Sequence, residues 1–166
     1  MKKLFVHSFK TALGTVRTAA TEKGLALIVL PSEPRGRFEK RIQKMFPGYE
    51  IAAGGPINKK AEKQLTAYLR GRQKKFTLKL DLHMAPFHRR VLAQVARIPY
   101  GKTMTYGAVA SAIGNPRASR AVGNANARND LPLVIPCHRV VASTGLGGYG
   151  GGLGLKKKLL RLEGAL

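Results

Sequence analysis

The sequence contains a single cysteine, Cys137, among its 166 residues. An internal disulfide framework and a zinc site built from paired cysteines are therefore excluded. No segment is long and apolar enough to span a bilayer, and the N-terminal residues lack the apolar run of a secretory signal. We therefore expect a cytoplasmic protein that has no membrane partner.

Acidic residues are also scarce. Eight Asp and Glu stand against 30 Lys and Arg, which gives a formal net charge of +22. A field of this sign attracts polyanions and speeds their encounter with the protein, so it favours a nucleic-acid partner. A generally basic surface without such a partner is the alternative. Residues up to Met84 include 18 basic and six acidic side chains, and the rest include 12 and two, so charge does not indicate which half binds.

The hydrophobic pattern predicts an α+β fold in two domains, of which the first covers residues 1–84. Within it, residues 3–30 have the pattern of β-strands separated by turns. Helices are expected over residues 31–46, which Pro47-Gly48 ends, and again around residues 65–71. Residues 75–80 alternate as a further strand does. This sheet-plus-helix domain carries no recognisable chemistry, so we predict a supporting role for it.

The second predicted domain, residues 85–166, has a mainly helical pattern. Apolar residues recur at helical spacing over residues 87–95. Thr105 can cap a short helix over residues 106–113, and Asn115 can cap a second helix, with Pro116 in its first turn, that reaches about Ala127. Two short helices joined by a tight turn are typical of a helix-turn-helix, although ordinary helical hairpins share this pattern.

The second of these two helices has an unusual composition for a helix that reads base edges. Arg120 stands among small or apolar residues, namely Ala118, Ala121, Val122, Gly123 and Ala125. Small side chains allow a close approach to a partner while one arginine projects, which suits shape-driven contact with a minor groove. A helix packed tightly against its neighbour, with Arg120 in solvent, is the alternative.

Cys137 lies in an apolar run over residues 131–141 that has the pattern of extended chain. Apolar neighbours disfavour the thiolate, so the default interpretation is an inert core cysteine. His138 could accept the thiol proton directly or through one water, and Arg139 adds positive charge. Adjacent side chains on a strand point to opposite faces, so a direct bond between Cys137 and His138 would require a turn.

Residues 85–164 resemble the O6-alkylguanine-DNA alkyltransferase family in several separate motifs that occur in the expected order. These motifs are Pro136-Cys137-His138-Arg139-Val140, Ile98-Pro99-Tyr100-Gly101, Thr105-Tyr106, Gly114-Asn115-Pro116, Ser119-Arg120-Ala121-Val122-Gly123, Gly148-Tyr149, Gly151-Gly152-Leu153, Lys156 and Leu159-Leu160-Arg161-Leu162-Glu163-Gly164. Agreement between independent blocks makes the resemblance specific. The first domain resembles the family only in its size and its order of strands and helices.

The resemblance implies roles for four catalytic residues. Cys137 is expected to be the nucleophile and permanent alkyl acceptor, and His138 to deprotonate it through a bridging water. Glu163 is expected to orient and polarise His138, while Asn129 holds the turn that brings these groups together. No cofactor and no metal ion is expected.

The resemblance also implies contacts with DNA and with a flipped base. DNA contacts are expected from Arg120, Tyr106, Ala121, Gly123 and Arg139, with Arg120 entering the base stack. The pocket for the base is expected to include Tyr106, Pro132, Val140, Ser143, Tyr149 and Gly150. Tyr106 would hydrogen-bond the base and assist guanine as a leaving group, and the backbone carbonyl groups of Cys137 and Val140 would accept from its amino group.

The function implied is repair of duplex DNA by a single-turnover methylated-DNA–protein-cysteine methyltransferase that acts as a monomer. The alkyl carbon lies inside the duplex, so the base must leave the stack before a thiol can reach it. The product is a thioether, which a protein without cofactor cannot reverse. The sequence leaves open the preferred adduct size and whether O4-alkylthymine is also a substrate.

Four residues depart from the family pattern. His88 and Leu92 replace Gln and Trp, Ser119 replaces Ala, and Asp130 replaces the Pro that usually follows Asn129. Two other functions are alternatives to alkyl transfer. An alkyltransferase-like protein that only binds lesions would lack Cys137, and a Cys-His hydrolase would leave the net charge of +22 unexplained.

Overall fold

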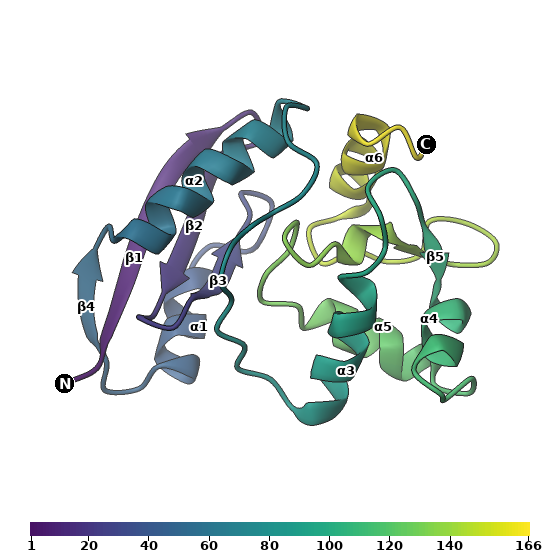
Figure 1. Cartoon of the computed structure of the whole chain (residues 1–166), viewed down its shortest axis with the longest axis horizontal. Helices are drawn as coiled ribbons and strands as arrows, with labels where there is room; N and C mark the ends of the chain where they lie inside the picture. The colour runs from purple at the N-terminus through teal and green to yellow at the C-terminus, as the bar shows by residue number, and fades with distance from the viewer. The chain divides into compact units, whose positions relative to one another are not determined.

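The computed structural model describes residues 1–166. The chain divides into two compact units, Met1–His83 and Met84–Leu166. Four of the strands form one sheet in the first unit, and four of the six α-helices lie in the second (Figure 1). The predicted α+β fold class is thus confirmed. No helix combines the length and the apolar character that crossing a membrane requires.

The first unit is built on a four-stranded sheet with the order β3-β2-β1-β4. Its strands are β1 (Lys3–Thr11), β2 (Gly14–Ala20), β3 (Leu25–Val29) and β4 (Glu50–Ala53). The β1–β2 hairpin turns at Ala12 and Leu13, and Gly14, which begins β2 directly after this turn, has a φ of +116° that glycine adopts readily. β4 is absent from the prediction, and it forms because its residues pair in parallel with the start of β1.

The predicted strand over residues 75–80 is wrong. This segment makes only an isolated bridge between Leu80 and Leu25, in which Leu25 N donates to Lys79 O and Asp81 N donates to Leu25 O. An alternating pattern requires a full row of partners to become a strand, and the segment meets β3 at one point only. The tertiary arrangement therefore overrides the local pattern here.

The helices of the first unit are α1 (Arg37–Met45) and α2 (Pro56–Leu69). α1 begins later than residue 31, because residues 31–36 form turns that end with Gly36 in a left-handed conformation. Phe38 and Phe46, at the two ends of α1, join Leu4 and Leu27 of the sheet in one apolar core. α2 contacts β1, β2 and β3 (Figure 1).

The second unit places short strands between helices. Its elements are α3 (Pro86–Val95), β5 (Met104–Thr105), α4 (Tyr106–Ala112), α5 (Ser119–Ala127), the 3₁₀ turn η1 (Cys137–Arg139), β6 (Val140–Val141) and α6 (Leu153–Leu162). α4 and α5 are the two helices of the predicted helix-turn-helix, and they pack against each other. Both also contact α3.

The boundaries of the two helices agree with the prediction only in part. Thr105 caps α4 as expected, since its Oγ1 accepts a hydrogen bond of 3.0 Å from Ala108 N. The expected cap at Asn115 is wrong, because α5 begins at Ser119. Residues 115–118 form a turn instead, in which Ala118 N donates to Asn115 O at 3.0 Å. Proline suits the second position of such a turn as well as it suits a first helical turn, so the sequence does not separate the two.

The segment around the cysteine is folded rather than extended, which corrects the prediction for residues 131–141. Leu133 has a positive φ of 74°, and η1 turns the chain at Cys137. β6 then pairs in parallel with β5, with Met104 opposite Val140. This pairing places the start of α4 beside the end of η1, so it assembles the site from segments that are distant in the sequence.

Candidate functional site

Cys137 lies in the wall of a pocket of about 440 Å³ in the second unit. The pocket is lined by Tyr106, Gly123, Asn126, Ala127, Cys137, Gly148, Tyr149 and Gly150. These residues come from the start of α4, one side of α5, η1 and the glycine-rich loop that precedes α6. Cys137 is 7% exposed, so its thiol is shielded from bulk solvent and borders a space that can hold a ring-sized ligand.

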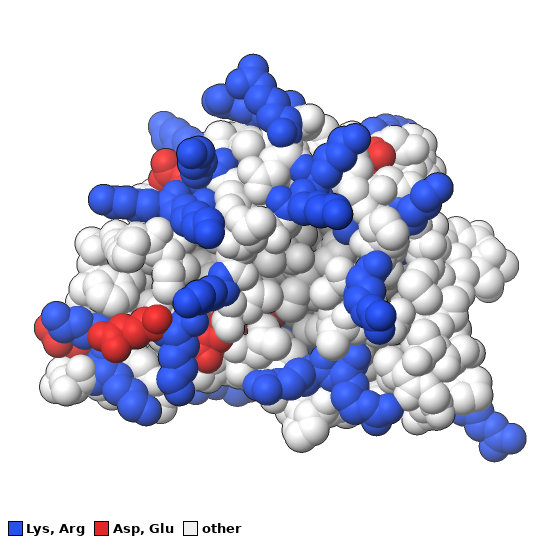
Figure 2. Space-filling model, in the orientation of Figure 1, with Lys and Arg blue, Asp and Glu red and all other residues white.

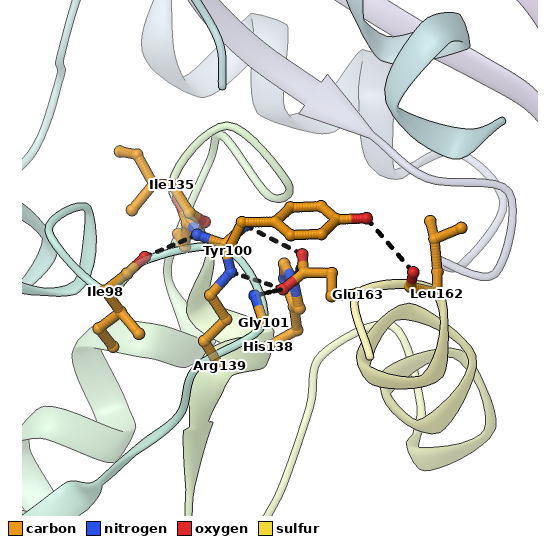
Figure 3. A network of polar contacts seen from close by, with 9 residues as sticks. Ile98, Tyr100, Gly101, Ile135, His138, Arg139, Leu162 and Glu163 are labelled. Atoms are coloured by element: carbon orange, nitrogen blue, oxygen red, sulfur yellow. Dashed lines mark hydrogen bonds and ion pairs between the residues drawn. The ribbon is translucent and has the colours of Figure 1, made fainter. Parts of the chain in front are cut away.

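The two residues that follow Cys137, His138 and Arg139, belong to a buried network centred on the Glu163 carboxylate (Figure 3). His138 Nε2 is 2.8 Å from Glu163 Oε2. Arg139 Nε donates to Glu163 Oε1 at 2.8 Å, and its Nη2 donates to Oε2 at 3.0 Å. The backbone N–H of Gly101 also donates to Oε1, at 3.3 Å. The carboxylate thus has charged and neutral donors around both of its oxygens, which a buried charge requires.

The network determines which nitrogen of His138 can act as a base. Because Nε2 faces the carboxylate, it carries the proton in the neutral ring and leaves Nδ1 as the basic nitrogen. Burial lowers the pKa of His138, while the hydrogen bond and the charge of Glu163 oppose this shift. The ring is therefore neutral at pH 7 and able to accept a proton. The predicted pairing of His138 with Glu163 is present in the structure.

Arg139 is placed differently from the expectation, which took it as a DNA contact. Its side chain is buried, two of its nitrogens bind Glu163, and Nη1 donates to Ile98 O at 2.7 Å. Its guanidinium also lies 5.7 Å from the centre of the Tyr100 ring. All of these partners are internal, so Arg139 neutralises Glu163 inside the protein and the expected DNA contact is wrong.

Asn129 bridges the turn that leads to the cysteine, as the expected role requires. Its Nδ2 donates to Ile135 O at 2.8 Å, and its Oδ1 accepts from Leu131 N at 2.9 Å. Asp130, at the position where the family pattern has proline, is buried. The turn closes with Asp130 in place, so the departure at this position is compatible with the hinge.

Tyr106 begins α4 and lines the pocket opposite the glycine-rich loop. Its hydroxyl donates to Gly148 O at 3.4 Å. Burial raises the pKa of Tyr106, and the nearby Cys137 acts in the same direction, so the phenol keeps its proton at neutral pH and remains a donor. Gly147 is required beside the ring, because a Cβ at this position would lie 2.7 Å from Tyr106 Cε2.

Lys156 is a site residue for which the sequence analysis assigned no role. It is fully buried, and its Nζ donates to Val140 O at 2.6 Å and to Gly148 O at 2.9 Å. The same ammonium lies 5.9 Å from the centre of the Tyr106 ring. Lys156 therefore ties β6, the glycine-rich loop and Tyr106 together. Its position on the apolar face of α6, in register with Leu159 and Leu160, is the signal that could have revealed it.

Lys156 is expected to make the stability of the protein depend on alkaline pH. Burial lowers its pKa from 10.5 to about 8, and Cys137 opposes this shift. Between these two values the unfolded chain binds more protons at Lys156 than the folded chain, so the free energy of unfolding rises with pH there. We expect wild-type protein to gain stability from pH 8 to 10 relative to Lys156→Met, measured by urea unfolding. Parallel pH profiles for the two proteins would contradict this.

The remaining expected pocket residues divide into two groups. Tyr149 and Gly150 line the pocket together with Tyr106, as predicted. Pro132 and Val140 are buried and Ser143 is exposed, and none of these three is among the residues that line this pocket, so their contact with a base stays a prediction. The Val140 carbonyl accepts from Lys156. The resemblance to the family implied the loop residues, but the sequence could not show which way the buried ones turn.

The α5 residues that were expected to contact DNA differ in their exposure and in the surface that they face. Arg120 is exposed and Ala121 is half-buried. Gly123 lines the pocket, and the nearest atom to a Cβ built there is Tyr106 Cε1 at 3.8 Å. One side of α5 therefore faces the Cys137 pocket, while Arg120 projects into solvent.

The exposed charge of the second unit is entirely positive. Its two acidic residues, Asp130 and Glu163, are buried. Ten of its 12 basic residues are exposed: Arg89, Arg90, Arg97, Lys102, Arg117, Arg120, Arg128, Lys157, Lys158 and Arg161. Figure 2 shows Lys and Arg side chains spread over the visible face, with Asp and Glu in only a few places. No acidic side chain offsets this field on the second unit, so its surface is suited to a polyanion.

These features define a class of protein: a buried free cysteine followed by a histidine that pairs with a carboxylate, next to a helix-turn-helix in a cationic unit. A family model described as the 6-O-methylguanine DNA methyltransferase DNA-binding domain matches residues 86–165. The methylated-DNA–protein-cysteine methyltransferase of Methanosarcina acetivorans is 39% identical over 163 residues, which are 98% of this chain and 99% of the relative. That of Methanosarcina barkeri is 40% identical over 165 residues, covering 96% and 97%.

Solved structures agree with these sequence relatives. A crystal structure of Mycobacterium tuberculosis OGT in complex with DNA has a TM-score of 0.82 and 32% identity, covering 97% of this chain and 93% of that one. An O6-methylguanine DNA methyltransferase from Methanococcus jannaschii has a TM-score of 0.68 and 32% identity, covering 96% and 93%. The chain belongs to the methylated-DNA–protein-cysteine methyltransferase family.

Proposed function

We propose that this protein repairs duplex DNA by transferring the alkyl group of O6-alkylguanine to Sγ of Cys137. The observation that carries the proposal is the position of Cys137, which borders a ring-sized pocket and precedes the buried His138–Glu163 pair. A thiol in such a pocket can reach an alkyl carbon only after the damaged base has left the stack. The membership of the family and the wholly cationic exposed charge of the second unit support DNA as the partner.

The proposed chemistry is one displacement at the alkyl carbon. Nδ1 of His138 takes the thiol proton, through one bridging water, and Glu163 stabilises the ring as its charge develops. The S–C bond forms as the bond from carbon to O6 breaks, and the electron pair of that bond stays on the guanine. The proton then returns to guanine, with the Tyr106 phenol as the neighbouring donor that stabilises the leaving group. A stable thioether remains, so one molecule repairs one lesion.

The test is the intact mass of the protein after it has been mixed with a duplex that contains one O6-methylguanine. We expect one methyl group per protein molecule, mapped by peptide analysis to Cys137, with no further gain when the lesion is in excess. The same duplex with unmodified guanine serves as the control. Repeated turnover of lesions by one protein molecule, or an unchanged mass, would refute the proposal.

Arg120 is proposed to enter the base stack in place of the damaged nucleotide, with α5 in the minor groove. It is exposed on α5, the helix whose other side lines the Cys137 pocket. We expect Arg120→Ala to slow methyl transfer from duplex DNA by about tenfold to 100-fold, because unstacking a base costs a few kcal/mol. Transfer from a single strand should change little. The control is Arg117→Ala, an exposed arginine in the preceding turn. Equal loss on duplex and single strand would contradict a flipping role.

Binding to DNA is expected to weaken steeply as salt is added. If the exposed cations of the second unit neutralise about six phosphates, affinity falls about 10³-fold between about 50 and 200 mM salt. Fluorescence anisotropy with an unmodified duplex measures this dependence without interference from the transfer reaction. An affinity that is independent of salt would show that apolar or base-specific contacts dominate the interface.

A further inference from the structure

Asn126 is an amide side chain in the α5 wall of the Cys137 pocket. It lies between Gly123, one turn earlier, and Ala127, and these three residues form the α5 contribution to the lining. Its side-chain Nδ2 and Oδ1 are both buried, and neither has a hydrogen-bond partner. Asn124, on the same helix, is exposed.

An unpaired buried amide is unfavourable for the fold. Native structures satisfy nearly all buried polar groups, because a lost hydrogen bond with water is not replaced. Leucine has nearly the same shape as asparagine and would fill the same space without this cost. An amide at position 126 is therefore explained if its partner arrives with a ligand. The pocket that Asn126 lines is the place where such a ligand would bind.

The neighbours of Asn126 leave room for a flat ring. Gly123 has no side chain and Ala127 has only a methyl group, so these two lining residues occupy little of the space next to α5. An amide offers one acceptor and two donor hydrogens at its edge. Guanine alkylated at O6 presents ring nitrogens that accept and a 2-amino group that donates. The edge of Asn126 therefore matches the edge of the alkylated base in hydrogen-bonding capacity.

We propose that Asn126 is a specificity-determining residue that hydrogen-bonds the alkylated base when this base occupies the Cys137 pocket. This inference rests on the proposed function, since it assigns a recognition role within the same reaction. Within the protein the amide of Asn126 has no hydrogen-bond partner, and the base would supply one on binding. Asn126 acts on the position of the base and takes no part in bond making.

The first test compares Asn126→Leu with wild-type protein and with Asn124→Leu, the exposed control. We expect Asn126→Leu to lower the single-turnover rate of methyl transfer at saturating duplex by about tenfold or more. Its thermal midpoint should equal or exceed that of wild type, since an unsatisfied amide has been removed. Asn124→Leu should keep the wild-type rate. Asn126→Ala, which adds no volume, is expected to show the same loss if leucine perturbs packing.

Two further measurements separate recognition from a structural effect. Alkylation of Cys137 by a small thiol reagent should be equal in the three proteins, because the nucleophile is unchanged. Duplexes with O6-methylhypoxanthine, which lacks the amino group, or with 1-, 3- or 7-deaza-O6-methylguanine identify the partner atom. On the substrate that lacks the partner atom, Asn126→Leu and wild-type protein should transfer the methyl group at the same rate. The inference would be overturned if Asn126→Leu transferred the methyl group as fast as wild type, or if its rate fell by the same factor on every substrate. Failure of the wild-type protein to accept any methyl group would instead overturn the proposed function.

Discussion

Cys137→Ser is expected to abolish methyl acceptance while DNA binding persists. A serine hydroxyl is a far weaker nucleophile than a thiol at neutral pH, so the rate should fall by about 10⁴-fold or more. Cys137 is 7% exposed, and serine has nearly the same volume as the cysteine that it replaces. The pocket and the cationic surface should therefore keep their structure. Intact mass measures the transfer, and anisotropy measures binding to a duplex with O6-methylguanine.

The binding measurement makes this prediction specific. Cys137→Ser should retain the affinity of wild type within a few-fold, because the other pocket residues are intact. Cys137→Ala is the matched control, since it removes the polar atom altogether. Methyl transfer by Cys137→Ala would show that another side chain is the acceptor. Loss of binding in both variants would show instead that the thiol contributes to the fold of the pocket.

Glu163→Gln is expected both to destabilise the protein and to slow methyl transfer. The carboxylate is fully buried and is the shared acceptor for His138 and Arg139. Its neutralisation leaves the Arg139 guanidinium buried without a counter-charge, which costs about 3–5 kcal/mol of the free energy of unfolding. His138 also loses the charge that stabilises its protonated form, so the transfer rate should fall by about 10²-fold. Urea unfolding and single-turnover kinetics measure the two effects.

A second substitution separates these two effects. Arg139→Met in the Glu163→Gln background removes the unpaired buried charge, so part of the stability should return. The transfer rate should stay low, because His138 still lacks its carboxylate. Recovery of the rate together with the stability would show that Glu163 acts only through the fold. The control is Glu39→Gln, which breaks the exposed pair with Arg17 and should cost at most about 1 kcal/mol.

Elements whose determinants are local were predicted well from the sequence. The turn next to Gly14 could be predicted because glycine readily adopts the φ of +116° found there, and the cap at Thr105 because one hydroxyl lies near the first free N–H groups. α3 and the end of α2 follow from apolar residues at helical spacing, whereas the start of α2 at Pro56 was not predicted. The errors fall where a segment depends on a distant partner. β4 required β1, and residues 75–80 lacked a strand partner along most of their length.

The same distinction between local and distant determinants applies to the candidate site. The motif around Cys137 and the pairing of His138 with Glu163 could be predicted, because the residue types carry the chemistry and the resemblance assigns the partners. The roles of Arg139 and Lys156 could not be predicted from the sequence. Both are cations, and composition predicts cations at the surface, yet Arg139 lies against Glu163 and Lys156 lies against two carbonyl groups. Only the three-dimensional arrangement shows that a buried charge has enough partners to stay there.

The surroundings of Cys137 combine properties that depend on residue type and order with properties that depend on tertiary packing. One thiol, a histidine directly after it and a charge that suits a polyanion can be read from residue type and order alone. Tertiary packing is what folds the run over residues 131–141 into a turn at η1 rather than a strand. It also places Asn126, Tyr106 and the glycine-rich loop around the thiol. Contacts between distant segments depend on packing of the whole unit, which local spacing does not encode.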